Sequence, residues 1–194
     1  MLSVFESDLT LAFNLSPIQL DDLDTPKRLD ALFSEHDIQP SQIVIEVTEE
    51  WALQSSNQLE TLNRLRMKGY GVSMDDFGTG FTNVTQLKHL PFSEIKIDRS
   101  FITNIHQDYF SQVIVKTLID ITKEYHYDLV AEGIESHEEY QYLKDLNANM
   151  VFQGYLISKP KPKDELIRWF HNWKKMSEAE GASKVKDEAV NNKN

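Results

Sequence analysis

The sequence has no cysteine among its 194 residues, so it can form neither a disulfide framework nor a thiolate metal site. Positive charge is also scarce, since 20 Lys and Arg stand against 31 Asp and Glu, for a formal net charge of -11. This balance argues against nucleic-acid polymers and anionic membrane surfaces as main partners, because both select clustered lysine and arginine. An acidic chain can still bind a phosphate ligand where metal ions neutralise its carboxylates.

Long apolar runs are missing as well. No stretch approaches the roughly 20 apolar residues that a membrane-spanning helix needs. The N-terminus, from Met1 to Asp8, lacks the basic region and apolar core of a secretory signal. These absences predict a cytoplasmic protein without direct membrane contact. With 40% hydrophobic and 26% charged residues, the composition is typical of one globular domain.

Short β-type runs alternate with helical patterns along the chain, which predicts parallel strands with helices packed over them. The β-type runs predict six strands, at 9–13, 43–48, 71–74, 95–97, 129–131 and 150–153. The helical patterns fall at 25–36, 55–68, 82–90, 109–126, 138–146 and 163–175. We therefore expect an α/β domain over residues 1–176. The polar tail at 177–194 is predicted to be disordered, because it has almost no large apolar residues.

Polar residues stand at or just after the end of every predicted strand. They are Asn14, Glu46, Glu49, Asp75, Asp76, Lys96, Asp98, Glu132, Glu135 and Gln153. In a (β/α) barrel the loops after the strands converge at one end, so these side chains are expected to surround one point. Singly they have simpler explanations, such as a turn for Asp75 and Asp76 or a helix cap for Asn14. Glu46 within a β-branched run is harder to explain, because an unpaired buried carboxylate is costly.

Carboxylates gathered this closely repel one another unless cations compensate their charge. Mg²⁺ or Mn²⁺ does this through oxygen ligands, and a two-metal site would suit phosphodiester hydrolysis. The six histidines lie away from the strand ends, which argues against an imidazole-rich zinc site. Two other barrel chemistries remain as alternatives. A glycosidase would use two carboxylates without metal, and a Schiff-base aldolase would use Lys96 as the nucleophile.

Six stretches resemble, in order, the motifs of the EAL family of bacterial cyclic-di-GMP phosphodiesterases, over about Leu9 to Pro162. They are Phe13-Asn14-Leu15-Ser16-Pro17, Ile45-Glu46-Val47-Thr48-Glu49, Asp75-Asp76-Phe77-Gly78-Thr79-Gly80, Ile95-Lys96-Ile97-Asp98-Arg99-Ser100-Phe101, Ala131-Glu132-Gly133-Ile134-Glu135 and Gln153-Gly154-Tyr155. The resemblance implies a TIM-like (β/α) barrel of the EAL type. It also implies hydrolysis of cyclic-di-GMP to the linear dinucleotide with Mg²⁺ or Mn²⁺, by a two-metal site.

The resemblance also implies roles for individual residues. The implied metal ligands are Asn14, Glu46, Asp75, Asp76 and Glu132. Lys96 would contact the attacking water as a base or an orienting charge, with Glu46 and Asp75 completing the catalytic set. The residues implied at the substrate are Asp76, Glu135 and Gln153. The residues Phe77, Gly78, Thr79 and Gly80 resemble a mobile loop that couples the site to a dimer contact, and Glu49 would fix that loop.

The chain departs from the family in lacking the Glu-Ala-Leu tripeptide, whose Glu is a metal ligand. Only six of the barrel's eight strands are predicted, so we expect a partial EAL domain with an incomplete barrel. The chain alone is then expected to have weak activity or none. The alternative is a non-catalytic module that binds cyclic-di-GMP or a protein partner. A homodimer, or an upstream sensory or GGDEF-type domain, is the further partner that the resemblance implies.

Overall fold

The computed structural model describes residues 9–48, 55–78, 87 and 89–175. The chain divides into two compact units, residues 1–158 and residues 159–194. In the second unit, residues 163–175 form the helix predicted there, and the rings of Trp169 and Trp173 stack with their centroids 6.2 Å apart. The tail predicted at 177–194 lies outside the described residues.

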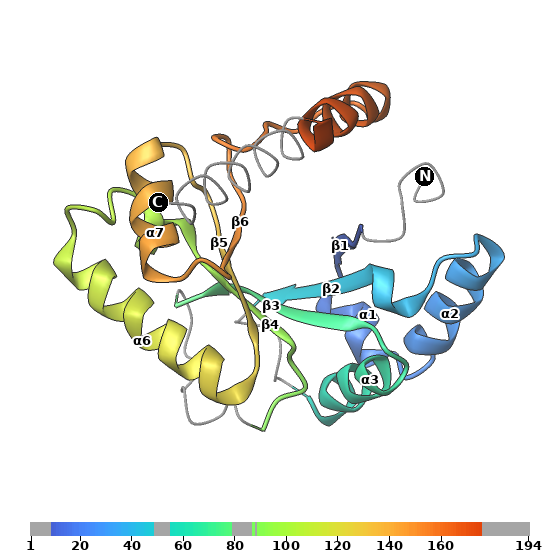
Figure 1. Ribbon diagram of the computed structural model, residues 1–194. Helices are drawn as coiled ribbons and strands as arrows, with labels where there is room; N and C mark the ends of the chain where they lie inside the picture. Colours follow the sequence, from blue (N-terminus) through green and yellow to red (C-terminus); the bar gives the residue numbers. More distant parts are fainter. Residues whose placement is uncertain (1–8, 49–54, 79–86, 88, 176–194) are drawn as a thin grey trace, which may run out of the picture. The chain divides into compact units, whose positions relative to one another are not determined.

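The first unit contains a six-stranded parallel sheet. The strands of this sheet lie side by side in chain order (Figure 1). They are β1 (Leu11–Asn14), β2 (Ile43–Thr48), β3 (Gly71–Phe77), β4 (Glu94–Ile97), β5 (Asp128–Ala131) and β6 (Val151–Phe152). Each strand pairs in parallel with the next. All six predicted strands are confirmed, although β3 runs on to Phe77 where the prediction ended at Met74.

The sheet curls into a half-barrel whose edges are β1 and β6. Both edges carry exposed apolar side chains, with Leu11 44% and Val151 51% exposed. This matches the expected α/β fold with six of the eight strands of a TIM-like barrel.

Helices connect the strands, as parallel pairing requires. They are α1 (Pro17–Asp21), α2 (Thr25–Glu35), α3 (Ser56–Met67), α5 (Arg99–Ile102), α6 (Tyr109–Tyr125) and α7 (His137–Leu146), with a 3-10 turn η2 (Pro40–Gln42) before β2. Most of the helix predicted at 82–90 lies outside the described residues. None of the described helices combines the length and the apolar character that crossing a bilayer requires.

Two short helices, α1 and α5, were not predicted from the sequence. Both are set by local capping. Ser16 and Gln19 form a reciprocal capping box with Pro17 at the first turn of α1. Asp98, immediately after β4, accepts a hydrogen bond from the backbone N–H of Ser100 and so begins α5. Helices of five and four residues leave no periodic apolar stripe for a pattern search to find.

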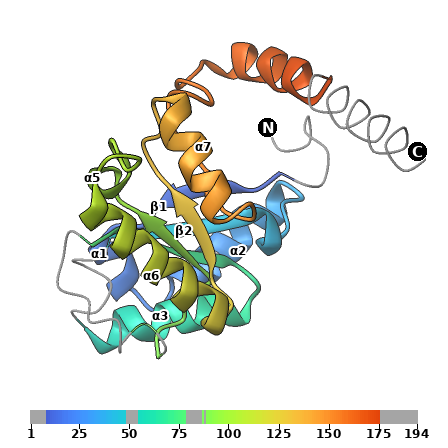
Figure 2. The same cartoon turned by 60° about the vertical axis from the view of Figure 1, so that its left-hand side comes forward.

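The two faces of the sheet differ in chemistry, as β2 illustrates. Ile43, Ile45 and Val47 are buried in the hydrophobic core, which also contains Leu62 and Leu65 of α3. Helices such as α3 and α6 lie beside the sheet (Figure 2). The alternate residues Glu46 and Thr48 lie on the other face and are partly exposed. This period of two follows from the pleat of a strand. The inner face of the half-barrel is therefore free to carry polar residues.

Candidate metal centre

Lys96 of β4 is the centre of the polar cluster on the inner face. Its side chain is 5% exposed, and its Nζ lies 2.8 Å from Glu46 Oε1, 2.8 Å from Asp75 Oδ1 and 2.5 Å from Glu132 Oε1. These carboxylates come from β2, from β3 and from the residue that follows β5. The ends of four adjacent strands thus converge on one ammonium group, as the sequence pattern predicted.

The protonation of Lys96 is fixed by these partners. Burial alone lowers the pKa of a lysine, because it penalises the charged form. Hydrogen bonds to Asp75, Glu132 and Glu46 outweigh that cost, so the pKa of Lys96 lies above its usual value. The residue is therefore a fixed cation in this arrangement.

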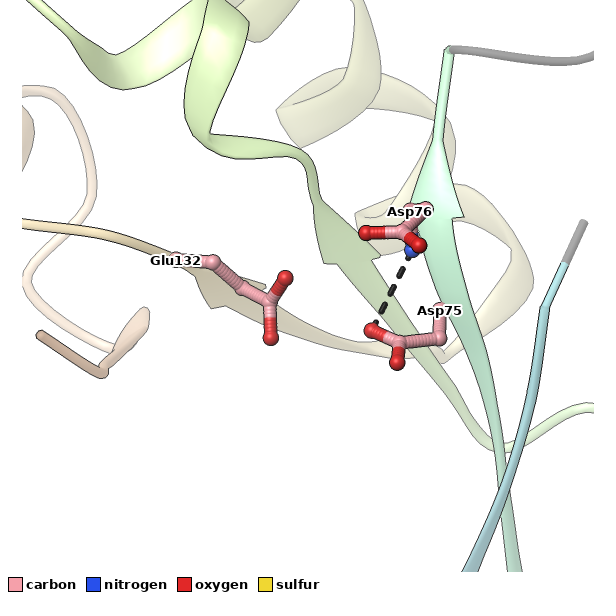
Figure 3. Close-up of side chains that lie close together, drawn as sticks. All are labelled: Asp75, Asp76 and Glu132. Atoms are coloured by element: carbon pink, nitrogen blue, oxygen red, sulfur yellow. Dashed lines mark hydrogen bonds between the residues drawn. The ribbon is translucent and has the colours of Figure 1, made fainter. Parts of the chain in front are cut away.

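A second grouping adjoins the lysine. Asp75, Asp76 and Glu132 each offer a carboxylate oxygen, and these oxygens all lie within 4.8 Å of one another. Figure 3 shows the Glu132 side chain, just after β5, reaching toward the two aspartates of β3. Three oxygens at this spacing can bind one divalent cation.

The end of β3 is distorted, and the distortion makes the grouping possible. The register between β3 and β4 shifts between Met74 and Phe77, which is the mark of a β-bulge. Asp76 has a φ of 57°, and its backbone N–H donates to Asp75 Oδ1 at 3.2 Å. A regular strand would send two consecutive side chains to opposite faces. The bulge instead brings both aspartates to the same site.

The carboxylates outnumber the cations of the cluster. Burial raises the pKa of Asp76, and the charges of Asp75 and Asp98 raise it further, although Lys96 opposes them. Burial likewise raises the pKa of Glu132, and its hydrogen bond to Lys96 lowers it only in part. Such a site has an excess of negative charge that a divalent cation would relieve. The atoms that could bind a metal ion are all oxygens, which fits hard ions such as Mg²⁺ or Mn²⁺.

Asn14 completes the set of predicted metal ligands. It lies on β1 directly beside Glu46 in the register, and its Nδ2 donates to Glu46 Oε2 at 3.2 Å. Asn14 therefore reaches the cluster through Glu46. All five predicted ligands lie at the same end of the sheet.

The predicted substrate and loop residues are less tightly grouped. Glu135 forms an ion pair with Arg99 at 3.0 Å. Gln153 extends the β5–β6 pairing, since its backbone N–H donates to the carbonyl oxygen of Ala131 at 2.9 Å. Gly78 follows β3 with a φ of 103°, and a Cβ there would lie 2.5 Å from the Phe101 ring, so only glycine fits.

Phe77 is buried at the end of β3. The loop residues Glu49, Thr79 and Gly80 lie outside the described residues.

Sequence reasoning missed two residues that hold the loop after β5. Arg99 packs on Gly133, where a Cβ would lie 2.5 Å from the Arg99 Cγ, and pairs with Glu135. Glu139 is buried and accepts three backbone hydrogen bonds. The Ser136-x-x-Glu139 spacing of a capping box was the signal that could have identified Glu139.

Comparison with known proteins places these residues in context. The sequence model of the EAL domain matches residues 2–160. The cyclic di-GMP phosphodiesterase RocR of Pseudomonas aeruginosa is 34% identical over 160 residues, which are 82% of this chain and 41% of RocR. The bifunctional diguanylate cyclase/cyclic di-GMP phosphodiesterase MucR of the same organism is 34% identical over 162 residues, 83% of this chain and 24% of MucR. The chain thus spans less than half the length of these relatives.

Solved structures of EAL-type proteins also match this chain. A complex of the MucR phosphodiesterase with c-di-GMP matches with a TM-score of 0.77 and 34% identity, over 85% of this chain and 67% of that one. The manganese/cy-diGMP complex of Klebsiella pneumoniae BlrP1 matches with a TM-score of 0.76 and 30% identity, over 81% of this chain and 41% of that one. A calcium/cy-diGMP complex of BlrP1 also matches, at 0.73 and 30%, over 78% and 39%.

Proposed function

The chain belongs to the EAL domain family, and from this premise we propose that it is part of a metal-dependent phosphodiesterase that hydrolyses cyclic-di-GMP to the linear dinucleotide. The observation that carries the proposal is the buried Lys96 held by three carboxylates, from β2, from β3 and from the residue that follows β5. Relatives that match this chain are named cyclic di-GMP phosphodiesterases. Neither a glycosidase nor an aldolase accounts for so many oxygen donors beside one lysine.

The residues that would hold divalent ions are Asn14, Glu46, Asp75, Asp76 and Glu132. Support comes from the close oxygens of Asp75, Asp76 and Glu132 and from the raised pKa of Asp76. Structures of BlrP1 carry manganese or calcium, and for this chain we propose Mg²⁺ or Mn²⁺ at two positions. In phosphodiester hydrolysis such ions supply an activated water and charge stabilisation at the leaving oxygen.

Lys96 is proposed to act as an orienting charge rather than as a base. A base must be deprotonated, whereas hydrogen bonds to the three carboxylates raise the pKa of Lys96 and so favour its charged form. Its ammonium group would hold the attacking water or a phosphate oxygen by hydrogen bonding, because a rigid cation stabilises developing negative charge without reorganisation. Glu46 and Asp75 fix the position of that ammonium group.

The substrate and partner assignments extend the proposal. Asp76, Glu135 and Gln153 would contact the nucleotide or its bound water. The loop that begins at Phe77, with Glu49, would couple the site to a dimer contact. MucR combines a phosphodiesterase with a diguanylate cyclase, so an upstream GGDEF-type domain is a proposed partner, and the cytoplasm is the proposed location.

A non-catalytic role in cyclic-di-GMP binding is the second candidate. It applies to the chain as given, because this sequence contains no Glu-Ala-Leu tripeptide and its described residues form six strands of the barrel. A receptor would bind the nucleotide without cleaving it.

Hydrolysis of cyclic-di-GMP by the purified chain tests the proposal. Reactions contain Mg²⁺, Mn²⁺ or a chelator, and variant Glu46→Ala is compared with Glu35→Ala, which alters an exposed residue of α2. Turnover that requires both metal and Glu46 supports the phosphodiesterase. A folded chain that binds cyclic-di-GMP by calorimetry without cleaving it supports the receptor. A folded chain that neither binds nor cleaves contradicts the receptor and agrees with the weak or absent activity expected of a partial domain. Metal-independent cleavage contradicts both.

A further inference from the structure

The loop between β5 and α7, residues 132–136, carries Glu132 and Glu135 and needs a defined position relative to Lys96. Glu132 contacts Lys96 at 2.5 Å, a distance that a small displacement of the loop would break. The β5 strand itself ends at Ala131. Two backbone hydrogen bonds hold the first residues of the loop, since the N–H of Glu132 donates to the carbonyl oxygen of Ile97 at 3.2 Å and the N–H of Ile134 to that of Gln153 at 3.1 Å. Further contacts must hold the residues after Ile134.

Glu139, in the first turn of α7, supplies those contacts from inside the protein. It is only 5% exposed. Its Oε2 accepts hydrogen bonds from the backbone N–H groups of Glu135 and Ser136, both at 3.0 Å. Hydrogen bonds to an ionised acceptor are about twice as strong as neutral ones. One buried carboxylate thus fixes the far end of the loop.

The other oxygen of Glu139 reaches a different segment. Oε1 accepts the backbone N–H of Asn104 at 2.9 Å. Asn104 lies just beyond α5, which follows β4, and it has a φ of 56°. Glu139 therefore ties the segment after β4 to the loop after β5. These are the strands that carry Lys96 and lead into Glu132.

A surface contact between the same two segments is weaker. Arg99 pairs with Glu135 at 3.0 Å, but their side chains are 56% and 44% exposed, and exposed ion pairs contribute little. The buried bonds of Glu139 are the stronger link. Burial raises the pKa of Glu139, yet its backbone hydrogen bonds outweigh burial and leave the pKa below the usual value, so the carboxylate is ionised at neutral pH.

We propose that Glu139 is a positioning residue, whose buried carboxylate holds the loop after β5 so that Glu132 faces Lys96 and the metal centre. Its part in metal binding rests on the function proposed above. Its part in holding Glu132 against Lys96 does not. Glutamine at this position keeps one acceptor oxygen. Its amide N–H₂ would point either at the backbone N–H of Asn104 or at those of Glu135 and Ser136, and two donors cannot bond to each other.

The test uses Glu139→Gln and Glu139→Leu in the full chain, with Glu138→Gln as the matched control. Glu138 lies in the same helical turn and is exposed. Heteronuclear NMR of the Lys96 ammonium group, without metal, reports its contact with Glu132. Calorimetry reports the affinity for Mn²⁺. Hydrogen exchange at Asn104, Glu135 and Ser136 shows whether the bonds themselves are lost.

We expect the Lys96 signal to shift or broaden in Glu139→Gln and to stay unchanged in Glu138→Gln. Mn²⁺ binding should weaken about tenfold in Glu139→Gln, as is usual when a residue that orients a metal ligand is altered. If Glu139→Leu fails to fold, Glu139→Gln still decides the question. Faster exchange at the three amides with an unchanged Lys96 signal and unchanged Mn²⁺ affinity would overturn the proposal and leave Glu139 as a helix cap.

The two hypotheses fail separately. If the unmodified chain binds no Mn²⁺, the metal-dependent phosphodiesterase is wrong. The Lys96 signal must nevertheless still change in Glu139→Gln for the positioning role to stand.

Discussion

Replacing Lys96 with methionine removes the one cation that three carboxylates share, while it keeps a linear side chain of similar length. Removing one partner of a buried ion pair typically costs about 3–5 kcal/mol, because the remaining charge loses its compensation. The three carboxylates retain 12%, 15% and 15% exposure, so water can solvate them in part. We therefore expect the lower end of that range, about 3 kcal/mol of unfolding free energy.

Urea denaturation in the presence of a chelator, followed by far-UV circular dichroism, measures this loss. With a slope of about 2 kcal/mol per molar urea, 3 kcal/mol corresponds to a midpoint lower by about 1.5 M. Lys116→Met, at an exposed position of α6, is the control, and its unfolding free energy should change by less than about 0.5 kcal/mol. Equal midpoints for the two variants would mean that the carboxylates do not converge on Lys96, and the reasoning would be refuted.

Three further predictions concern stability. Gly78→Ala should lose about 1–3 kcal/mol in urea titrations, because a φ of 103° strains alanine and its Cβ would meet the Phe101 ring; no loss would contradict that geometry. Gly154→Ala should lose about 1–3 kcal/mol or more, because its Cβ would lie 2.2 Å from the Ile134 carbonyl oxygen; a stable variant would rule out that approach. The pKa of Glu139 lies below the ordinary 4.5, so its stabilisation is complete above about pH 5 and is lost as the pH falls through the folded-state value. The gap in unfolding free energy to Glu139→Gln should therefore shrink between pH 7 and pH 3.5, and a constant gap would argue against an ionised Glu139.

The sequence predicts strands well where alternation and β-branching coincide. The prediction for β2 matches both of its ends, because Ile43, Ile45 and Val47 are apolar on one face while the other face is mixed. The end of β3 was missed because Asp75 and Asp76 resemble a turn in any local reading. Only the bulge against β4, a tertiary feature, lets both aspartates remain in the strand.

The sequence predicts which residues lie near the candidate site, but not which of them are in contact. Strand ends on a barrel imply convergence, so the inward residues were found without distances. Which carboxylates share Lys96 depends on the curl of the sheet. The role of Glu139 depends on where α7 begins relative to Asn104, which lies 35 residues earlier. The local sequence shows the capping box of Ser136 and Glu139, but it gives no sign of the hydrogen bond from Asn104.

The curl of the sheet shortens the distances that Lys96 and its carboxylate partners have to span. Adjacent strands lie about 4.8 Å apart, so in a flat sheet Glu46 on β2 would start nearly 10 Å from Lys96 on β4 and about 14 Å from Glu132 after β5. Both carboxylates instead lie within hydrogen-bond distance of the same Nζ. The curl therefore brings the site together, and the ion pairs in turn hold strands that are not neighbours. It follows that Lys96→Met loses contacts between strands that are not neighbours as well as the compensation of three carboxylate charges, and both losses contribute to its lower unfolding free energy.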